Sequence, residues 1–312
     1  MSSLRVVVFC GGVGAARLLD GIVRVVDDPT EVTAICNVSD DLQWHGLHIS
    51  PDIDTVIYSL AHREGKFGWG LEGDTNVALE ELRLLSGDEW FTVGDGDLAT
   101  HIWRSEQLRS GATLSEVTTA LATARGIKAR LIPVTNDKHP TIVITENGEL
   151  MFQDYFVRRH AEDSVIGFRF PGAESAQPAP GVVEAIDGAD LLVIAPSNPF
   201  VSIDPLLAIS SVRNAVLKSA VPCVAISPII GGKAVKGPAA DMLRSLGHET
   251  SALGVARIYN NLIDTFVIDK IDAQLTAEIE RLGIDAIVLD TMMRDHKGRT
   301  RLASELLAVA IP

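Results

Sequence analysis

The sequence predicts an α/β fold in which one parallel sheet is covered by helices on both faces. Along most of the chain, short apolar runs rich in β-branched residues alternate with segments of helical period. The runs are nearly continuous in hydrophobicity, as is typical of parallel strands that are buried on both faces. The middle of the chain departs from this alternation. We therefore expect residues 1–312 to form a single α/β domain, with residues 56–180 as an insertion subdomain within it.

The apolar runs give the expected order of the core strands. The first run, residues 4–10, leads into a glycine turn and an amphipathic segment, and the second, residues 31–37, ends at a cluster of aspartates. The later runs are residues 190–199, 221–230, 265–269 and 285–291. Each is short and is separated from the next by a segment that suits a helix. This succession predicts a doubly wound, Rossmann-like parallel sheet.

The insertion subdomain is expected to be mostly helical and to pack against the edge of the core. Residues 75–87 and 113–126 carry apolar side chains at helical spacing. Residues 141–157 alternate between apolar and polar positions around Asn147 and Gly148, which is a strong signal for a β-hairpin.

Composition excludes several classes of partner. The net charge is −14 and there is no basic block, so we expect no nucleic-acid partner. No apolar run approaches the eighteen or more residues of a membrane span, and the N-terminus reads as a strand and not as a secretory signal. Cys10, Cys36 and Cys223 lack metal or disulfide spacing, so we expect buried free thiols in a cytoplasmic protein.

A glycine-rich segment, "FCGGVGAARLLDG", joins the first strand to a helix. Gly11, Gly12 and Gly14 allow backbone amides to approach a phosphate at the start of that helix. The segment is neither a P-loop nor a complete dinucleotide fingerprint, because Arg17 stands where the third glycine would be. The alternative is a tight turn without a ligand. Arg17 either lies over a bound phosphate or is a solvated helix residue.

Four aspartates follow the second strand within "NVSDDLQWHGLHISPDIDT". Asp52 and Asp54 in an extended loop would point to one side, and paired carboxylates suit Mg²⁺ or Mn²⁺ bridging a diphosphate. The alternative is that Asp52 or Asp54 caps the following helix. Asp40 and Asp41 complete the cluster. His45 lacks the neighbours of a zinc site, so we expect it to contact substrate or to support the aspartates.

Three further segments are expected to reach the same crevice, because each lies at the end of a strand or the start of a helix. "VGDGDLATHIWRS" carries Asp95, Asp97, His101 and Arg104, and "APSNPFVSI" carries Ser197 and Asn198. "SPIIGGKAVKGPA" provides a second possible phosphate nest with Gly231, Gly232, Lys233 and Lys236. Each segment alone is also compatible with an ordinary loop. No nucleophile with a partnered base is apparent, so the residues favour electrostatic catalysis at phosphorus over covalent catalysis.

Taken in order, these five segments resemble the CofD/FbiA family of phospholactyl or phosphoenolpyruvyl transferases in coenzyme F-420 biosynthesis. The resemblance runs from about residue 5 to about residue 295. The related gluconeogenesis-factor proteins, which are nucleotide-sugar-binding regulators, follow their paired aspartates with a different loop. A non-catalytic nucleotide sensor of that type is the alternative function. An NAD-dependent oxidoreductase is disfavoured by Arg17 and by the lack of a suitable acidic residue after the second strand.

The resemblance implies a reaction. A phospho-three-carbon-acid group (phospholactyl, phosphoenolpyruvyl or phosphoglyceryl) moves from a guanosine diphosphate ester to the ribityl hydroxyl of the deazaflavin Fo, and GMP is released. It also implies that Mg²⁺ is required, with Asp40 and Asp54 as the expected metal ligands. The expected catalytic residues are Asp40, Asp54 and Asp52, of which one acts as base for the hydroxyl or holds it for attack. A homodimer is the expected assembly.

The family pattern also implies how the substrates are held. The glycine turn and the residues around Ser197 would bind guanosine diphosphate, and Trp44, Trp69 and His101 would form a wall for the deazaflavin, although ordinary core positions suit them equally. Gly96 stands where relatives commonly have arginine, so Arg104 or Arg63 is expected to compensate. The expected substrate-contacting residues are Gly11, Gly12, Gly14, Arg17, Asp41, Trp44, His45, Asp95, His101, Ser197, Asn198, Pro199, Gly231 and Lys233.

Overall fold

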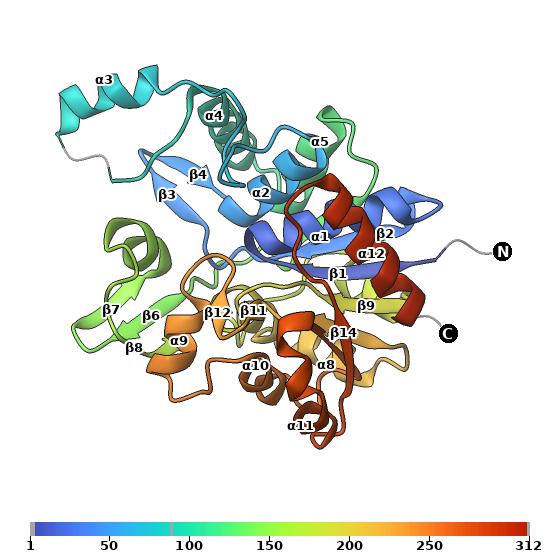
Figure 1. Cartoon of the computed structure of the whole chain (residues 1–312). Coiled ribbons are helices and arrows are strands. Elements are labelled where there is room, and N and C mark those ends of the chain that lie inside the picture. The colour runs from blue at the N-terminus through green and yellow to red at the C-terminus, as the bar shows by residue number, and fades with distance from the viewer. Residues whose placement is uncertain (1–3, 88–89, 311–312) are drawn as a thin grey trace.

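A seven-stranded sheet forms the centre of the computed structural model, which describes residues 4–87 and 90–310 (Figure 1). Its strands are β1 (Val6–Cys10), β2 (Val32–Cys36), β5 (Arg130–Pro133), β9 (Leu191–Ile194), β10 (Cys223–Ile226), β13 (Thr265–Asp269) and β14 (Asp285–Leu289). They lie in the order β14-β13-β10-β9-β1-β2-β5, and every pair is parallel. The predicted doubly wound parallel sheet is therefore confirmed.

The central strands are apolar along their whole length because helices cover both faces of the sheet. All residues of β1, β2, β9 and β10 are buried. In the register of the sheet, Val6 pairs with Val32 on one side and with Leu191 on the other. The three cysteines, Cys10, Cys36 and Cys223, lie in these strands as buried free thiols, as the sequence predicted.

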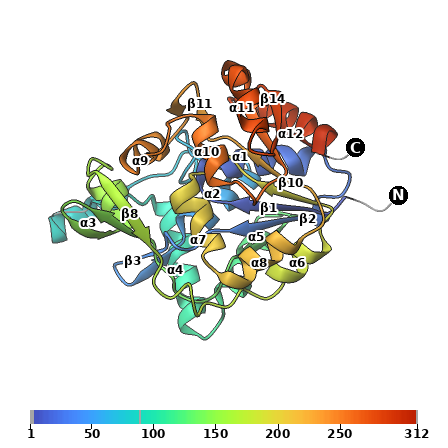
Figure 2. The ribbon, with the colours of Figure 1, turned by 90° about the horizontal axis from the view of Figure 1, so that it is seen from below.

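Helices α1 (Gly12–Val25), α2 (Pro51–Leu60) and α12 (His296–Ala310) pack together on one face of the sheet (Figure 1). Helices α6 (Val182–Gly188) and α8 (Ser210–Lys218) pack together on the other face, which is nearer the viewer in Figure 2. Layers of helices on both sides explain why the strands lack alternating polar residues.

The remaining helical elements are mostly short. They are η1 (Pro29–Glu31), α3 (Val77–Ser86), α4 (Asp95–Arg109), α5 (Leu114–Ala124), η2 (Asp154–Arg158), η3 (Pro199–Ile203), α7 (Asp204–Leu207), α9 (Ala239–Ser245), α10 (Ala252–Ile258), η4 (Lys270–Leu275) and α11 (Thr276–Glu280). Within residues 4–87 and 90–310, no single helix is long and apolar enough to cross a membrane. One strongly bent helix pair, Pro199–Leu207 with Ser210–Lys218, meets the criteria of length and composition only when its two parts are joined.

The segment 56–180 contributes one strand to the central sheet. Strand β5 pairs with β2 at the edge of the sheet, and α5 packs on it. The sequence pattern did not predict this strand, because four residues ending in Pro133 give too short a signal. The two helices expected at residues 75–87 and 113–126 are confirmed as α3 and α5.

The predicted β-hairpin is also confirmed. Strands β6 (Ile142–Thr145) and β7 (Gly148–Met151) pair antiparallel, and β8 (Val165–Arg169) adds a third strand that was not predicted. Thr145 pairs with Gly148, so the turn consists of Glu146 and Asn147 and lies one residue before the expected position. A separate small hairpin is formed by β3 (Leu42–Trp44) and β4 (Leu47–Ile49).

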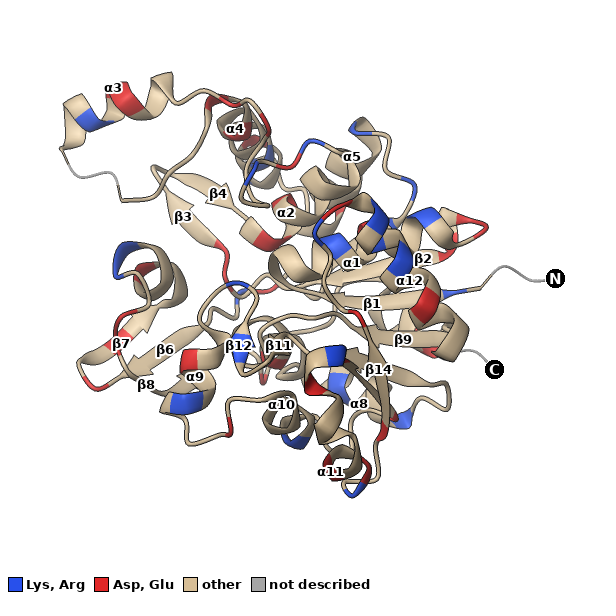
Figure 3. Cartoon of the chain, in the orientation of Figure 1, with Lys and Arg blue, Asp and Glu red and all other residues tan. Residues whose placement is uncertain are grey.

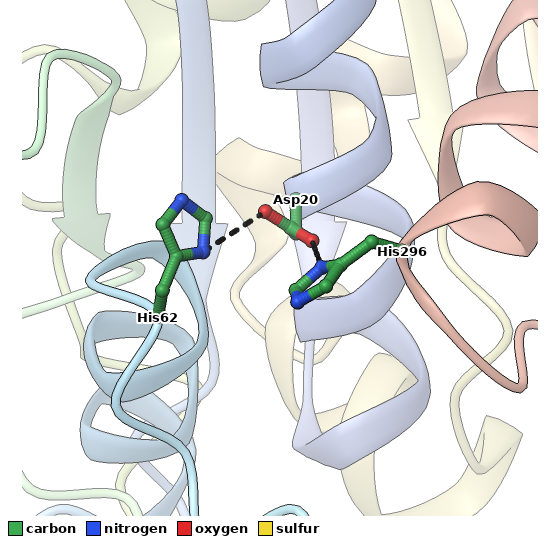
Figure 4. A group of neighbouring side chains, drawn as sticks. All are labelled: Asp20, His62 and His296. Carbon is green, nitrogen blue, oxygen red and sulfur yellow. Dashed lines mark hydrogen bonds and ion pairs between the residues drawn. The ribbon is translucent and has the colours of Figure 1, made fainter.

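A cluster of charged side chains around Asp20 connects α12 to α1 through ion pairs. Figure 4 shows the Asp20 carboxylate between the rings of His62 and His296, with distances of 3.6 Å and 3.2 Å to their Nδ1 atoms. Arg299 of α12 donates to Asp20 at 3.0 Å and Arg24 at 2.9 Å. The Arg24 guanidinium also lies 3.1 Å from His62 Nδ1, where a metal ion would need to bind. We therefore interpret this cluster as a set of ion pairs that holds the helices together, and not as a metal site.

Candidate active site

The predicted crevice lies at the carboxyl ends of β1 and β9, where the strand order of the sheet changes direction. The chain leaves β1 into the glycine turn and leaves β9 into the segment around Ser197. The Ser197 hydroxyl donates to the backbone carbonyl of Gly11 at 2.8 Å. Two segments that are 186 residues apart in sequence therefore meet where open α/β sheets bind ligands.

Two of the three glycines in the turn are required by this meeting. A Cβ atom on Gly14 would lie 2.3 Å from the carbonyl oxygen of Pro196, and one on Gly11 would lie 2.4 Å from Cβ of Ser202. Gly12 adopts a positive φ of 72° and has no atom closer than 3.9 Å to an added Cβ. Gly11 and Gly14 thus allow close packing of the two segments, whereas Gly12 faces open space.

A cavity of about 1000 Å³ opens above this turn. Figure 3 shows acidic residues at the start of α2 and where the chain enters β3. The cavity is lined by the expected residues Gly11, Gly12, Gly14, Arg17, Asp40, Asp52, Asp54, His101, Ser197 and Asn198. The expected residues outside its lining are Asp41, Trp44, His45, Asp95, Pro199, Gly231 and Lys233.

Asp40 and Asp52 form a pair of buried carboxyl groups at the cavity. Burial raises the pKa of Asp40 well above its usual range, and the charge of Asp52 raises it further. Burial likewise raises the pKa of Asp52 to about 6. Within the described residues, the Oδ1 atom of Asp40 is buried without a hydrogen-bond partner. An oxygen of this kind is costly to bury unless a cation or a proton donor binds to it.

Asp52 and Asp54 lie in the first turn of α2, so the prediction of an extended loop is wrong. The helix begins with Pro51 and its N-cap is Ser50, so neither aspartate is the cap. Residues two apart on a helix point to different sides. Asp52 accepts from the Asn37 side chain at 2.9 Å and from the backbone of Gly12, beside the glycine turn.

Asp54 points instead toward α4 and forms an ion pair with Arg104. The Arg104 side chain is completely buried, and its two terminal nitrogens each donate to one Asp54 oxygen. Arg104 NH1 also lies 3.2 Å from Nδ1 of His101. Because a guanidinium only donates, this contact makes Nδ1 the acceptor, so a proton on Nε2 would face the Asp97 carboxylate, which lies 3.4 Å away. Arg104 is therefore not available to replace an arginine at Gly96.

Asp97 and Tyr58 extend this network along the cavity wall. The Tyr58 hydroxyl donates to Asp97 at 2.5 Å, and Nε2 of His101 lies 3.4 Å from the same oxygen. Burial would raise the pKa of Asp97, but the hydrogen bonds from His101 and Tyr58 outweigh it and lower the pKa. Ligand atoms of Asp54, Asp97 and His101 lie within 4.8 Å of one another, yet Arg104 already supplies the compensating positive charge.

Asp41 supports the fold of the β3–β4 hairpin. Its carboxylate is 2.7 Å from Nε2 of His48 and accepts from the Ser50 hydroxyl at 2.7 Å. Trp44 is buried in a small core with Ile49, and it does not reach the cavity. His45 lies in the exposed turn of the same hairpin with φ of 48°. These positions explain why three expected substrate contacts are absent from the cavity lining.

Asp95 caps helix α3. It accepts from the hydroxyl of Thr75 at 2.5 Å and from the backbone amides of Val77 and Ala78 at 3.0 Å and 2.9 Å. The hydrogen bond from Thr75 is the largest cause of a lowered pKa at Asp95. The carboxylate is thus committed to a helix terminus, and this explains its position outside the cavity lining.

The segments after β9 and β10 differ in their relation to the cavity. Asn198 lines the cavity and caps η3 by accepting a hydrogen bond from the amide of Phe200 at 3.0 Å. Pro199 is the first residue of η3 and is buried outside the cavity lining. Gly231 donates its amide to Asp272 at 2.9 Å, so that amide is not directed at a phosphate. Lys233 is exposed outside the lining.

Several residues that support or line the site were absent from the expected set. Asn37 is fully buried at the end of β2 and orients Asp52, and Gln153 donates to the backbone carbonyl of Asp40 at 3.0 Å. The sequence feature that could have identified Asn37 as a site residue was its position at the end of a strand. Aromatic residues that line the cavity are Tyr58, Phe67, Trp69, Trp90, Phe91, Phe152 and Phe156. The rings of Phe152 and Phe156 are stacked with their centroids 5.5 Å apart.

Basic side chains also line the cavity, near the glycine turn. In the described part of the chain they are Arg17, Lys66, Lys236 and Arg294. Arg63 is exposed outside the lining. The cavity thus combines a carboxylate pair, a glycine turn, aromatic walls and cations that can receive an anionic group.

Comparisons with known proteins agree along nearly the whole chain. The family model described as "2-phospho-L-lactate transferase CofD" matches residues 6–307. A protein of Kitasatospora aureofaciens named phosphoenolpyruvate transferase is 40% identical, with 98% of each chain covered. A protein of Methanosarcina mazei named 2-phospho-L-lactate transferase is 37% identical, over 95% of this chain and 97% of the relative.

The fold is also found among solved structures. A member of the UPF0052 family from Bacillus halodurans matches with a TM-score of 0.65 and 17% identity, with 98% of this chain and 99% of that chain covered. At this level of identity the likeness establishes the fold alone.

Proposed function

Because the chain belongs to the CofD family of 2-phospho-L-lactate transferases, we propose that it is a transferase of coenzyme F-420 biosynthesis. In this proposal it moves a phospho-three-carbon-acid group from a guanosine diphosphate ester to the ribityl hydroxyl of Fo and releases GMP. The relatives named phosphoenolpyruvate transferase and 2-phospho-L-lactate transferase support this reaction class. The observation that carries the proposal is the pair Asp40 and Asp52 beside the glycine turn in one cavity.

The donor is assigned to the end of the cavity formed by the glycine turn. Gly12 faces open space there, and Ser197, which contacts Gly11, lines the cavity together with Asn198. Amides at the start of α1 and the cation of Arg17 would stabilise a diphosphate at this position. These contacts would fix the phosphorus atom while the acceptor hydroxyl approaches.

The residues present also fit Mg²⁺. Asp40 has a buried oxygen without a hydrogen-bond partner among the described residues, and Asp52 stands beside it. Hard carboxylate oxygens of this kind suit Mg²⁺, which would neutralise charge on the diphosphate and on the leaving GMP. We assign the ion to Asp40 and Asp52 in place of the expected Asp40 and Asp54, because Arg104 already occupies Asp54.

The acceptor is assigned to the aromatic part of the cavity. Stacked Phe152 and Phe156, together with Trp69, offer apolar faces to a planar deazaflavin. His101 and Asp97 line the same cavity and lie 3.4 Å apart. Asp97, whose carboxylate is held by Tyr58 and His101, would accept a hydrogen bond from a hydroxyl of the ribityl chain. Asp40 or Asp52 would take the proton of the attacking hydroxyl.

Turnover with defined substrates tests this function. The purified protein would be incubated with Fo and either guanosine diphosphate ester, lactyl or enolpyruvyl, with Mg²⁺ or with a chelator. We expect GMP and Fo that carries the phospho-three-carbon-acid group to appear together. Both should form only with Mg²⁺, and faster with one of the two esters. Binding of the nucleotide without release of GMP in any mixture would contradict the transferase and favour a nucleotide sensor.

We also infer that the chain forms a homodimer. Leu84 and Leu85 on α3 are 79% and 84% exposed, and apolar side chains of this kind are often covered in subunit interfaces. Light scattering after size-exclusion chromatography would give twice the mass of the chain. A monomer at all concentrations would contradict this inference.

A further inference from the structure

A glycine-rich loop, residues 65–73 with the sequence GKFGWGLEG, covers the glycine-turn end of the cavity. The loop closes on itself through a hydrogen bond of 2.9 Å from the amide of Gly65 to the carbonyl of Gly70. Phe67 and Trp69 line the cavity but remain 64% and 53% exposed. Exposed aromatic residues on a glycine-rich loop suit a part that changes its contacts when a ligand binds.

Two contacts hold this loop down. A Cβ atom on Gly68 would lie only 2.5 Å from a methyl group of Val13, so the loop rests directly on the glycine turn. The ammonium group of Lys236, from the loop after β12 (Lys233–Ala234), donates to the carbonyl of Phe67 and lies 4.9 Å from the ring centroid of Trp69. Lys236 therefore connects the two sides of the cavity entrance through a cation–π contact and one hydrogen bond.

Lys236 and Arg17 place two positive charges at this entrance, and the negative charge that acts on both, that of Glu64, is already paired with Arg299. Burial lowers the pKa of Lys236, and the charge of Arg17 lowers it further. Arg17 is half-buried, and among residues 4–87 and 90–310 its Nε atom has no hydrogen-bond partner and NH1 donates to the carbonyl of Met293 at 3.5 Å. In the part of the chain that the structure describes, neither cation forms an ion pair. Two like charges held together in this way are stabilised when an anion binds between them.

We propose that Arg17 and Lys236 bind the donor diphosphate, and that Lys236 thereby locks residues 65–73 over it. The locked loop fixes Trp69 as a face for the planar acceptor, so the nucleotide binds before the acceptor. The identity of the donor and of the acceptor rests on the proposed function, but the coupling of diphosphate to the loop does not.

The test measures GDP binding and the fluorescence of Trp69, without any acceptor. The signal of Trp69 is the difference between the wild type and Trp69→Phe, because Trp44, Trp90 and Trp103 also emit. We expect GDP to change this signal in the wild type. Lys236→Met should weaken GDP binding in calorimetry by about tenfold or more and abolish the change, since a hydrogen-bonded charge is lost.

Two control variants separate this role from general effects. Lys218→Met removes the same charge at an exposed site on α8 and should bind GDP as the wild type does. Lys236→Arg keeps the charge and should restore both GDP binding and the Trp69 signal, while circular dichroism confirms that each variant is folded.

Unchanged GDP affinity in Lys236→Met would overturn the inference, and so would GDP binding that leaves the Trp69 signal unchanged. Absence of GDP binding in the wild type would overturn it as well. If GDP binding and the Trp69 signal behave as expected but no GMP is released from the diphosphate esters with Fo, the proposed function fails and the coupling stands.

Discussion

The guanidinium of Arg104 and the carboxylate of Asp54 form a buried ion pair between two helices, although the two residues are 50 positions apart in sequence. The pair joins α2, which carries Asp52 to the cavity, to α4, which carries His101. It therefore fixes the distance between the two sides of the candidate site. A residue expected from the sequence to bind a metal has instead a structural partner of opposite charge.

Removal of one partner of this pair should destabilise the protein strongly. Asp54→Ala leaves the buried Arg104 charge without compensation, so we expect a loss of about 3–5 kcal/mol in the free energy of unfolding, measured by urea denaturation. Asp241→Ala is the matched control, because its ion pair with Arg244 is exposed and should contribute little. Equal stability of Asp54→Ala and the wild type would show that the pair is not needed for the fold.

The stability of the metal-free protein should depend on pH through Asp40. Its pKa is raised, so the folded protein holds a proton at pH values where the unfolded chain has already released it. The folded state therefore loses stability as the pH rises through this range. Asp40→Asn removes this cost, and with a chelator present we expect its Tm to exceed that of the wild type by about 2 °C at pH 8.

This gain should shrink toward pH 4, where the wild-type carboxyl group is protonated in the folded state and about half protonated in the unfolded chain. Calorimetric melting curves from pH 4 to pH 8 would measure it. Asp187→Asn, at an exposed site of α6, provides the control for a general change in charge. A difference in Tm that is the same at every pH would contradict the burial of a costly charge at Asp40.

Close packing at the glycine turn gives a prediction for Gly14. In Gly14→Ala the new methyl group would lie 2.3 Å from a backbone carbonyl, which cannot move without shifting the segment after β9. We expect a loss of about 1–3 kcal/mol and a loss of nucleotide binding. Gly247→Ala is the control, since it has a positive φ but open space around it, and should cost about 1 kcal/mol with nucleotide binding kept. Normal nucleotide binding by Gly14→Ala would contradict the role of the glycine turn in binding the nucleotide.

The core of the fold could be predicted because its strands are nearly continuous apolar runs, and the structure confirms all six of them. The missed strand β5 has four residues, of which Arg130 is exposed and Pro133 ends the run, so its local pattern is that of a loop. Its place in the sheet is decided by pairing with β2, which lies almost a hundred residues earlier. A contact of this range leaves no periodic signal in the sequence.

The candidate site could be predicted at positions where a ligand-binding type of residue also stands at the end of a predicted strand. The glycine turn and Ser197 both end strands, and the structure brings them together at 2.8 Å. The geometry of Asp52 and Asp54 was misjudged, although Ser50 and Pro51 carry the signal of a helix start, with proline in the first turn. The partners of Asp41, Asp95 and Gly231 could not be predicted, because each is a tertiary contact that occupies a polar group.

The central position of β1 also has a consequence during synthesis of the chain. Val6 meets Val32 early, but its partner on the other side, Leu191, is made much later. Until then a growing chain on the ribosome presents a fully apolar strand with one unpaired edge, which attracts strands of other chains. We expect chaperones that shield nascent chains to affect the yield of this protein more than that of proteins whose neighbouring strands are consecutive.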